Sequence, residues 1–253
     1  MLRGLITRRA LSSLVQVQQT KSEYAIVQMN RPPVNSLNTA LIQELTQTIQ
    51  SLEKDPTCRG MILASTSAPK IFCAGLDILE MYQPTKESLD EFWRSLQNLY
   101  MTLYPSSLIT LAAIDGHSPA GGCFLALCCD ERFMSKGNIG LNETRLGIVA
   151  PSWFQDVLIQ TIGHRQAEKM LGLGLQYDAS TAAAIGLIDV HCTTESALDT
   201  AQKRMTEWLK IPDRARQLIS LQIGRLCRER LHALRARHAE GRGRLPQRVH
   251  GQA

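Results

Sequence analysis

The chain has 253 residues, of which 44% are hydrophobic and 20% charged, so it can bury a sizeable core without disulfide or metal cross-links. This composition excludes collagen-like, coiled-coil and wholly disordered chains, and no apolar run reaches the roughly 18 residues that a membrane-spanning helix requires. Residues 1–20 carry a net charge of +3 and residues 224–253 carry +6, which leaves −4 for the body out of a total of +5. Because the positive charge lies at the two ends, we expect no nucleic-acid partner and no membrane association.

The N-terminal segment, residues 1–20, has three arginines, no acidic residue and apolar positions that could line one face of a helix. This composition is typical of a mitochondrial transit peptide. A merely disordered N-terminus is the alternative, since any twenty residues can lack acids. We predict a transit peptide over residues 1–20 and a folded core from residue 21.

The first half of the body alternates between strand and helix patterns, which predicts an α/β fold. A strand at 25–29 ends at Arg31-Pro32-Pro33, since proline cannot donate to a strand ladder. Asn38 is placed to cap the helix that follows, whose apolar residues run from Leu41 to Leu52 at helical spacing. The next predicted elements are a strand at 60–64, an amphipathic helix at 86–104 and a strand at 107–114.

The second half of the body is predicted to be mostly helical. A turn at 115–122 leads into a helix that opens at Cys123, and short extended pieces lie around Phe133 and Ile139. We divide the chain into a core at 21–190, a helical region at 191–223 and a basic tail at 224–253. The later elements are helices at 153–161, 164–173, 179–185, 195–210 and 212–223, with a strand at 187–190.

The last thirty residues differ in composition from the rest, because they contain eight arginines and no lysine. A tail that binds an anionic partner and a solvated or foreign segment are the two interpretations, and we favour the second. The seven cysteines are odd in number and form no C-x-x-C motif, so we expect neither a disulfide framework nor a metal site. Most of them lie among apolar neighbours and are predicted to be buried in a protein of a reducing compartment.

Two turns of small residues could present backbone N–H groups to a ligand. Phe72-Cys73-Ala74-Gly75-Leu76-Asp77 follows a strand, and Ala120-Gly121-Gly122-Cys123 stands between a strand and a helix. Glycine and alanine allow close approach, and the first N–H groups of a helix lack partners. If the two turns lie close together in the fold, their N–H groups would form an oxyanion hole. A single turn of this kind is more often just a tight turn.

Two other patterns are weaker. Gly116-His117-Ser118-Pro119-Ala120 nearly matches the nucleophile elbow of serine hydrolases, but the residue after the serine must donate an N–H and Pro119 has none. Gly172 to Gln176 has two spaced glycines inside a helical pattern and lacks the third glycine of a dinucleotide site. We therefore set both interpretations aside.

Several ordered motifs together resemble the crotonase (enoyl-CoA hydratase/isomerase) superfamily over about residues 24–222. They are NRPPVNSL at 30–37, AGLD at 74–77, DGHSPAGGC at 115–123, CDER at 129–132 and GLNETRLGI at 140–148. Within that family, the variants PPVNSL, SPAGGC and IGLNETRLGIVAP are similar to those of its isomerases.

The resemblance implies a spiral of ββα units with a C-terminal helical region that forms a homotrimer. It assigns the oxyanion hole to the amides of Ala74 and Gly121 and the catalytic carboxylate to Glu143. The acyl-CoA site is implied for Ala74, Gly75, Leu76, Asp77, Ile78, Gly121 and Asn142. No cofactor is implied, because coenzyme A is part of the substrate.

Residue 124 separates two activities of the family. Hydratases of the family carry a second glutamate at this position, and the two glutamates share the positioning of water and the transfer of protons. This chain has Phe124 instead. Moving a proton from C2 to C4 of one acyl chain needs one base, and Glu143 suffices. We expect an isomerase that converts 3-enoyl-CoA to trans-2-enoyl-CoA in the β-oxidation of unsaturated fatty acids. Phe124 could equally be ordinary core packing.

Two alternatives stay open. One is a crotonase-like acyl-CoA-binding protein with little activity, which the unusual tail at 224–253 favours and the retained Glu143 opposes. The other is an enoyl-CoA hydratase, which Phe124 opposes. The terminal Gly-Gln-Ala is not a peroxisomal signal, so the mitochondrial matrix is the expected location.

Overall fold

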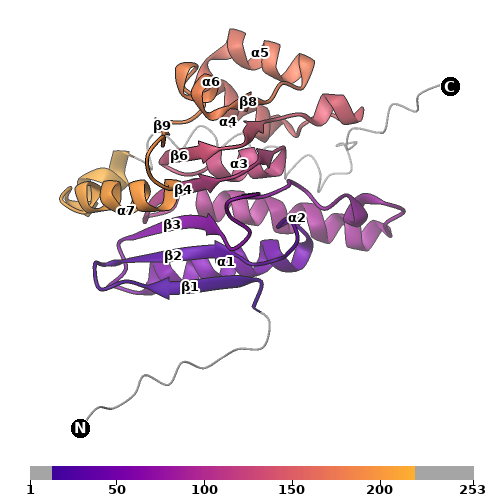
Figure 1. Cartoon of the computed structure of the whole chain (residues 1–253). Helices are drawn as coiled ribbons and strands as arrows, with labels where there is room; N and C mark the ends of the chain where they lie inside the picture. The colour runs from indigo at the N-terminus through magenta and orange to yellow at the C-terminus, as the bar shows by residue number, and fades with distance from the viewer. Residues whose placement is uncertain (1–12, 220–253) are drawn as a thin grey trace, which may run out of the picture.

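The computed structural model describes residues 13–219, and a six-stranded sheet forms its centre (Figure 1). Its order is β1-β2-β3-β4-β6-β9; β1 pairs antiparallel with β2 and every later pair is parallel. The α/β prediction is therefore confirmed. The strands are β1 (Val15–Gln19), β2 (Tyr24–Met29), β3 (Gly60–Ser65), β4 (Ile109–Asp115), β6 (Glu131–Lys136) and β9 (Val190–His191).

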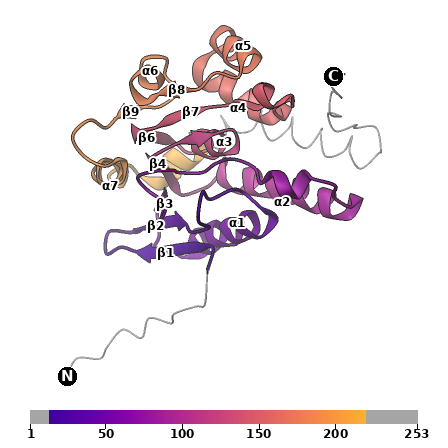
Figure 2. The same cartoon turned by 45° about the vertical axis from the view of Figure 1, so that its right-hand side comes forward.

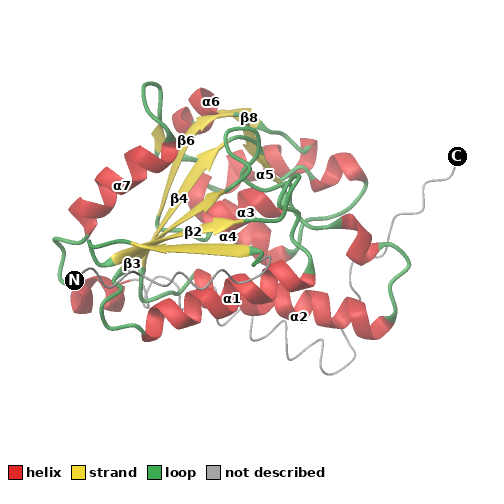
Figure 3. Cartoon of the chain, turned by 60° about the horizontal axis from the view of Figure 1, so that its bottom comes forward, coloured by secondary structure: helices red, strands yellow, loops and turns green. Residues whose placement is uncertain are grey.

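Both faces of this sheet are buried, because alternate residues of each central strand enter two different apolar clusters. In β2, Val27 packs with helices α1 (Thr39–Lys54) and α2 (Lys86–Leu103), whereas Ile26 packs with α7 (Ala197–Trp208). Figure 3 shows α1 and α2 along one side of the strands and α7 along the other. The continuous apolar pattern of the inner strands is thus explained by helices on both sides.

A second, smaller unit lies at the end of the molecule far from β1 (Figure 2). Its three-stranded sheet has the order β5-β7-β8, and α3 follows β5 directly. This unit contributes the α3 start and Glu143 to the site, while the turn at 73–77 after β3 contributes the rest. Its elements are β5 (Ser118–Pro119), α3 (Gly121–Leu127), β7 (Asn138–Gly140), η2 (Glu143–Leu146), α4 (Ser152–Ile162), α5 (His164–Leu173), β8 (Tyr177–Asp178) and α6 (Ala179–Ala184).

Local sequence signals account for most of these elements. The Asn38 side chain accepts a hydrogen bond from the Leu41 N–H at 3.0 Å, so the predicted cap of α1 is confirmed. The strand predicted at 187–190 is displaced, since only Val190 and His191 pair with β6. The predicted helix at 212–223 lies only partly within the described residues, and the predicted tail at 224–253 lies outside them.

The start of the folded core differs from the prediction. Val15–Gln19 form the edge strand β1, which pairs residue for residue with β2. Just before it, the N–H of Leu14 donates to the carboxylate of Glu44 on α1 at 3.2 Å. The core therefore begins before Val15, inside the segment assigned to a transit peptide; residues 1–12 of that segment lie outside the described part.

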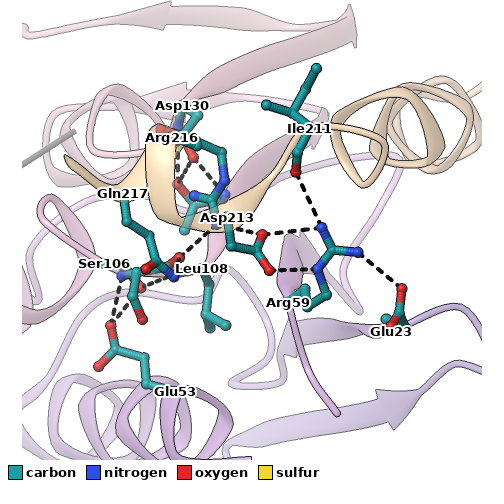
Figure 4. Close-up of polar contacts among 12 residues, drawn as sticks. Glu23, Glu53, Arg59, Ser106, Leu108, Asp130, Ile211, Asp213, Arg216 and Gln217 are labelled. Carbon is teal, nitrogen blue, oxygen red and sulfur yellow. Dashed lines mark hydrogen bonds and ion pairs between the residues drawn. The ribbon is translucent and has the colours of Figure 1, made fainter. Parts of the chain in front are cut away.

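Arginine side chains form hydrogen bonds and ion pairs between the segment after α7 and the body of the protein (Figure 4). Arg59, directly before β3, donates to the Asp213 carboxylate at 2.7 Å and to the Ile211 carbonyl at 3.2 Å. The buried Arg216 donates to the Ser107 carbonyl at 2.8 Å. These contacts join residues about 110 to 150 positions apart, and they hold the end of the described chain against the strands.

Between residues 13 and 219, no helix is both long and apolar enough to cross a membrane. Over the same range, no three histidine, cysteine or acidic side chains are grouped so that they could hold a metal ion. The six cysteines of this part are all buried, as predicted for most of them, while Cys227 lies outside it.

Candidate active site

Glu143 is a buried carboxylate that receives no hydrogen bond from any other described residue. It opens the short helix η2, just after β7, and is only 5% exposed. Neither of its carboxylate oxygens accepts a hydrogen bond from another described residue. Burial raises the pKa of Glu143 from 4.5 to about 7. Such a group exchanges protons readily at neutral pH, which is what a general base requires.

The start of α3 lies beside this carboxylate. The Ala120 N–H donates to the Gly140 carbonyl at 2.8 Å, which joins the first turn of α3 to the strand that precedes Glu143. Burial raises the pKa of the Cys123 thiol, and the nearby Glu143 charge raises it further. Glu143 therefore lies near the N-terminal end of α3, where Gly121 is the first residue.

Gly122 is required by the close approach of α3 to the turn at 73–77. A Cβ atom at position 122 would lie 2.3 Å from the Cys73 carbonyl oxygen, much closer than real Cβ contacts allow. A Cβ at Gly121 would lie 3.1 Å from the Leu76 nitrogen. Gly122 therefore cannot carry a side chain without moving the two turns apart, and a side chain at Gly121 would be tightly packed. The two turns meet here, as the oxyanion-hole hypothesis requires.

The amide predicted at Ala74 is not available to a ligand. The Ala74 N–H donates to the Val34 carbonyl at 3.0 Å, which corrects its assignment to the oxyanion hole. The next turn residue, Gly75, has φ +94°, and this left-handed conformation turns the following peptide toward α3. The Leu76 N–H makes no hydrogen bond among the described residues and adjoins Gly121. The Gly121 N–H, at the first position of α3, also has no partner among the described residues, so the two adjacent amides left without a partner there are those of Leu76 and Gly121.

The remaining predicted binding residues fall into two groups. Asn142 lies next to Glu143, and its buried Oδ1 has no described partner. Asp77 instead has a structural role, because its carboxylate accepts from the Leu79 N–H at 3.1 Å and pairs with Arg31 at 2.7 Å. Ile78 follows on the surface and is 67% exposed. Asn142 is thus placed with the base, whereas the Asp77 side chain holds the loop.

Phe124 lies in an aromatic cluster behind the start of α3. Its ring is fully buried and stacks on Phe154 with 3.7 Å between centroids and an angle of 3°. Trp153 packs edge-on against it at 5.0 Å, and Tyr100 closes the group at 5.6 Å. Sequence reasoning did not identify the α4 aromatics as neighbours of the site, although the adjacent pair Trp153-Phe154 at the start of a predicted helix was the available signal.

The buried Glu143 carboxylate thus lies near the amides of Leu76 and Gly121, which have no partner among the described residues. Chemically, such a set of groups can remove a proton next to a carbonyl and stabilise the oxyanion that forms. The family model for enoyl-CoA hydratase/isomerase matches residues 19–239, and the chain belongs to this family. That match ends inside the segment 224–253, which composition alone set apart from the body.

Named relatives and a solved structure agree with this assignment. The chain is 47% identical to mitochondrial enoyl-CoA delta isomerase 1 of Mus musculus over 197 residues, which cover 77% of this chain and 68% of the relative. The Homo sapiens protein of the same name is 41% identical over 210 residues, covering 82% and 69%. The crystal structure of human mitochondrial delta3-delta2-enoyl-CoA isomerase superposes with a TM-score of 0.86 at 39% identity, covering 88% of each chain.

Proposed function

We propose that this protein is an enoyl-CoA isomerase that converts 3-enoyl-CoA to trans-2-enoyl-CoA in the β-oxidation of unsaturated fatty acids. The observation that carries the proposal is Glu143, a buried carboxylate with a pKa of about 7, near two amides; within residues 13–219 neither the carboxylate nor the amides have a hydrogen-bond partner from another residue. The isomerase names of the relatives that are 41–47% identical support the same reaction.

The thioester oxygen of the substrate binds between the N–H groups of Leu76 and Gly121. These donors stabilise negative charge on that oxygen, so the proton on C2 becomes more acidic. The Glu143 carboxylate takes the C2 proton, which leaves a dienolate whose charge extends to C4. Glu143 then returns the proton to C4, and the double bond settles between C2 and C3. One base completes the cycle and no water is consumed.

The surroundings of residue 124 favour isomerisation over hydration. Hydration needs a second group that positions a water molecule for attack on C3. Phe124 supplies no polar atom, and its ring packs against Phe154 and Trp153. A carboxylate in its place would enter an aromatic cluster, where an unpaired charge is strongly disfavoured.

Three further statements belong to this proposal. The mitochondrial relatives and the basic segment 1–20 support a location in the mitochondrial matrix. The family resemblance supports a homotrimer. Coenzyme A enters as part of the substrate, and we propose no separate cofactor.

The direct test is turnover of trans-3-hexenoyl-CoA by the full chain, with the 2-enoyl product followed by its near-ultraviolet absorbance. Glu143→Gln keeps the shape of the side chain and removes its basicity, so we expect turnover to fall by at least about 10³-fold. Binding of a saturated acyl-CoA should be retained by this variant.

Product analysis separates the alternatives. Accumulation of 3-hydroxyacyl-CoA from a 2-enoyl-CoA substrate would favour a hydratase. A folded protein that binds acyl-CoA without any turnover would favour a binding protein. Near-normal turnover by Glu143→Gln would remove Glu143 from the mechanism.

A further inference from the structure

The peptide that supplies the Leu76 N–H is held by a segment from the other side of the turn. The Leu37 N–H donates to the Gly75 carbonyl at 2.8 Å, and this carbonyl belongs to the same peptide as the Leu76 N–H. In a trans peptide the C=O and N–H point in opposite directions, so fixing the carbonyl also fixes the direction of the donor. A hydrogen bond to the carbonyl also polarises the peptide and strengthens its N–H.

Residues 34–37, here called the brace, make two more backbone bonds to the same turn. The Ala74 N–H donates to the Val34 carbonyl at 3.0 Å, and the Asp77 N–H donates to the Leu37 carbonyl at 3.1 Å. Three bonds thus join the brace to residues 74–77. The direction of the Leu76 N–H is therefore set by the conformation of the brace.

Asn35 fixes that conformation. It is fully buried and has φ +53°, a left-handed conformation that asparagine tolerates better than most residues. Its backbone N–H donates to the Arg31 carbonyl at 2.8 Å, and its Oδ1 accepts from the Arg31 N–H at 2.8 Å. Its Nδ2 donates to Ser65 Oγ at 2.8 Å and to the Phe72 carbonyl at 3.1 Å. One side chain thus joins the loop after β2, the end of β3 and the start of the turn.

We propose that Asn35 is a positioning residue for the isomerase reaction, which acts through the brace to aim the Leu76 N–H at the substrate oxygen. This inference rests on the proposed function. The Asn35 side chain is buried and its amide is occupied on three sides, so it acts on the reaction only through the peptides that it holds. A misplaced donor loses its effect on the developing oxyanion, while the rest of the substrate still binds.

The test variant is Asn35→Gly, which removes the side chain and tolerates the left-handed backbone. The matched control is Asn30→Gly in the same loop. The Asn30 side chain donates to the Ser13 carbonyl at 3.0 Å and accepts from the Thr66 hydroxyl at 3.0 Å, and neither partner belongs to the brace. We expect kcat to fall by about 10²-fold in Asn35→Gly and by less than about threefold in Asn30→Gly. The Kd for free coenzyme A should change by less than about threefold in both.

A spectroscopic readout distinguishes positioning from a general loss of structure. A saturated acyl-CoA labelled with ¹³C at its thioester carbonyl is bound to each variant, and the carbonyl stretch is measured by infrared difference spectroscopy. Hydrogen bonds from the oxyanion hole lower this frequency in the native protein. We expect most of that shift to be lost in Asn35→Gly and retained in Asn30→Gly.

If Asn35→Gly does not fold, Ser65→Ala is the second test variant. Ser65→Ala keeps Asn35 and removes only one acceptor of its side-chain amide. It should lower kcat and the carbonyl shift in the same direction by a smaller factor. Native kcat and a native carbonyl shift in a folded Asn35→Gly or Ser65→Ala protein would overturn the inference. If the native protein binds acyl-CoA but does not turn it over, the proposed function fails, and the carbonyl shift still decides the role of Asn35.

Discussion

Replacing Glu143 with glutamine should stabilise the fold at the same time as it abolishes turnover. An acid whose pKa is raised on folding binds its proton more tightly in the folded protein than in the unfolded chain. Protonation of Glu143 therefore supports the fold fully below pH 4.5, and this support is lost as the pH rises through about 7. Glutamine cannot ionise, so the variant escapes this loss.

The size of the effect follows from the raised pKa. The change from 4.5 to about 7 corresponds to ~3 kcal/mol at about 1.4 kcal/mol per pH unit, since Glu143 is only 5% exposed and little screened by solvent. The ionised carboxylate should cost ~3 kcal/mol at pH 8 and ~1 kcal/mol at pH 5, where it is mostly protonated when folded. The gain from Glu143→Gln should therefore be ~2 kcal/mol larger at pH 8.

The assay is urea unfolding of the native protein and of Glu143→Gln, at pH 5 and at pH 8. Each comparison is made at one pH, so every other titrating group cancels between the two proteins. Any cost of burying the glutamine amide is also the same at both pH values. An equal difference between the two proteins at pH 5 and pH 8 would refute a pKa raised by burial, and a smaller gain at pH 8 would reverse its sign.

Three further predictions concern the same region. The kcat/KM of the native protein should follow ionisation of Glu143, half-maximal near pH 7 and about a tenth of its plateau near pH 6; a flat profile over this range would contradict the assignment. Gly122→Ala should lower the unfolding temperature sharply, because its Cβ would lie 2.3 Å from the Cys73 carbonyl oxygen; an unchanged melting curve would show that the two turns are not so close. Phe124→Ala should lower the free energy of unfolding by about 3–5 kcal/mol in urea titrations, since it leaves a cavity against Phe154; a loss below about 1 kcal/mol would argue against the stacked cluster.

Most of the fold could be predicted because local patterns and tertiary packing agree. Asn38 caps α1 as its side-chain chemistry predicts, and the apolar runs of the inner strands match burial on two faces. Strand β1 was missed because its alternation, Val15-Gln16-Val17-Gln18, is short and only Val15 of its five residues is buried. Its conformation comes from pairing with β2, which is a tertiary effect.

The site was only partly accessible from the sequence. Glu143 and Gly121 follow from motifs, and the structure places them at one end of α3. Which amide of the other turn stays free was not accessible, because the acceptor that occupies Ala74 belongs to Val34, forty residues earlier in the chain. The pKa of Glu143 was equally hidden, since burial depends on packing around it rather than on its neighbours in sequence.

Buried polar atoms without hydrogen bonds gather around Glu143. Of seven buried side-chain polar atoms without a hydrogen bond in the described part of the chain, four belong to Ser118, Asn142 and Glu143. Ser118 Oγ would lie 3.1 Å from a Cβ on Gly122, so this group also adjoins the start of α3. Each such atom destabilises the fold, and a core that uses both faces of the sheet offsets the loss. Partners for Glu143 would stabilise its charge and lower its pKa, and in the proposed reaction a weaker base would remove the C2 proton more slowly.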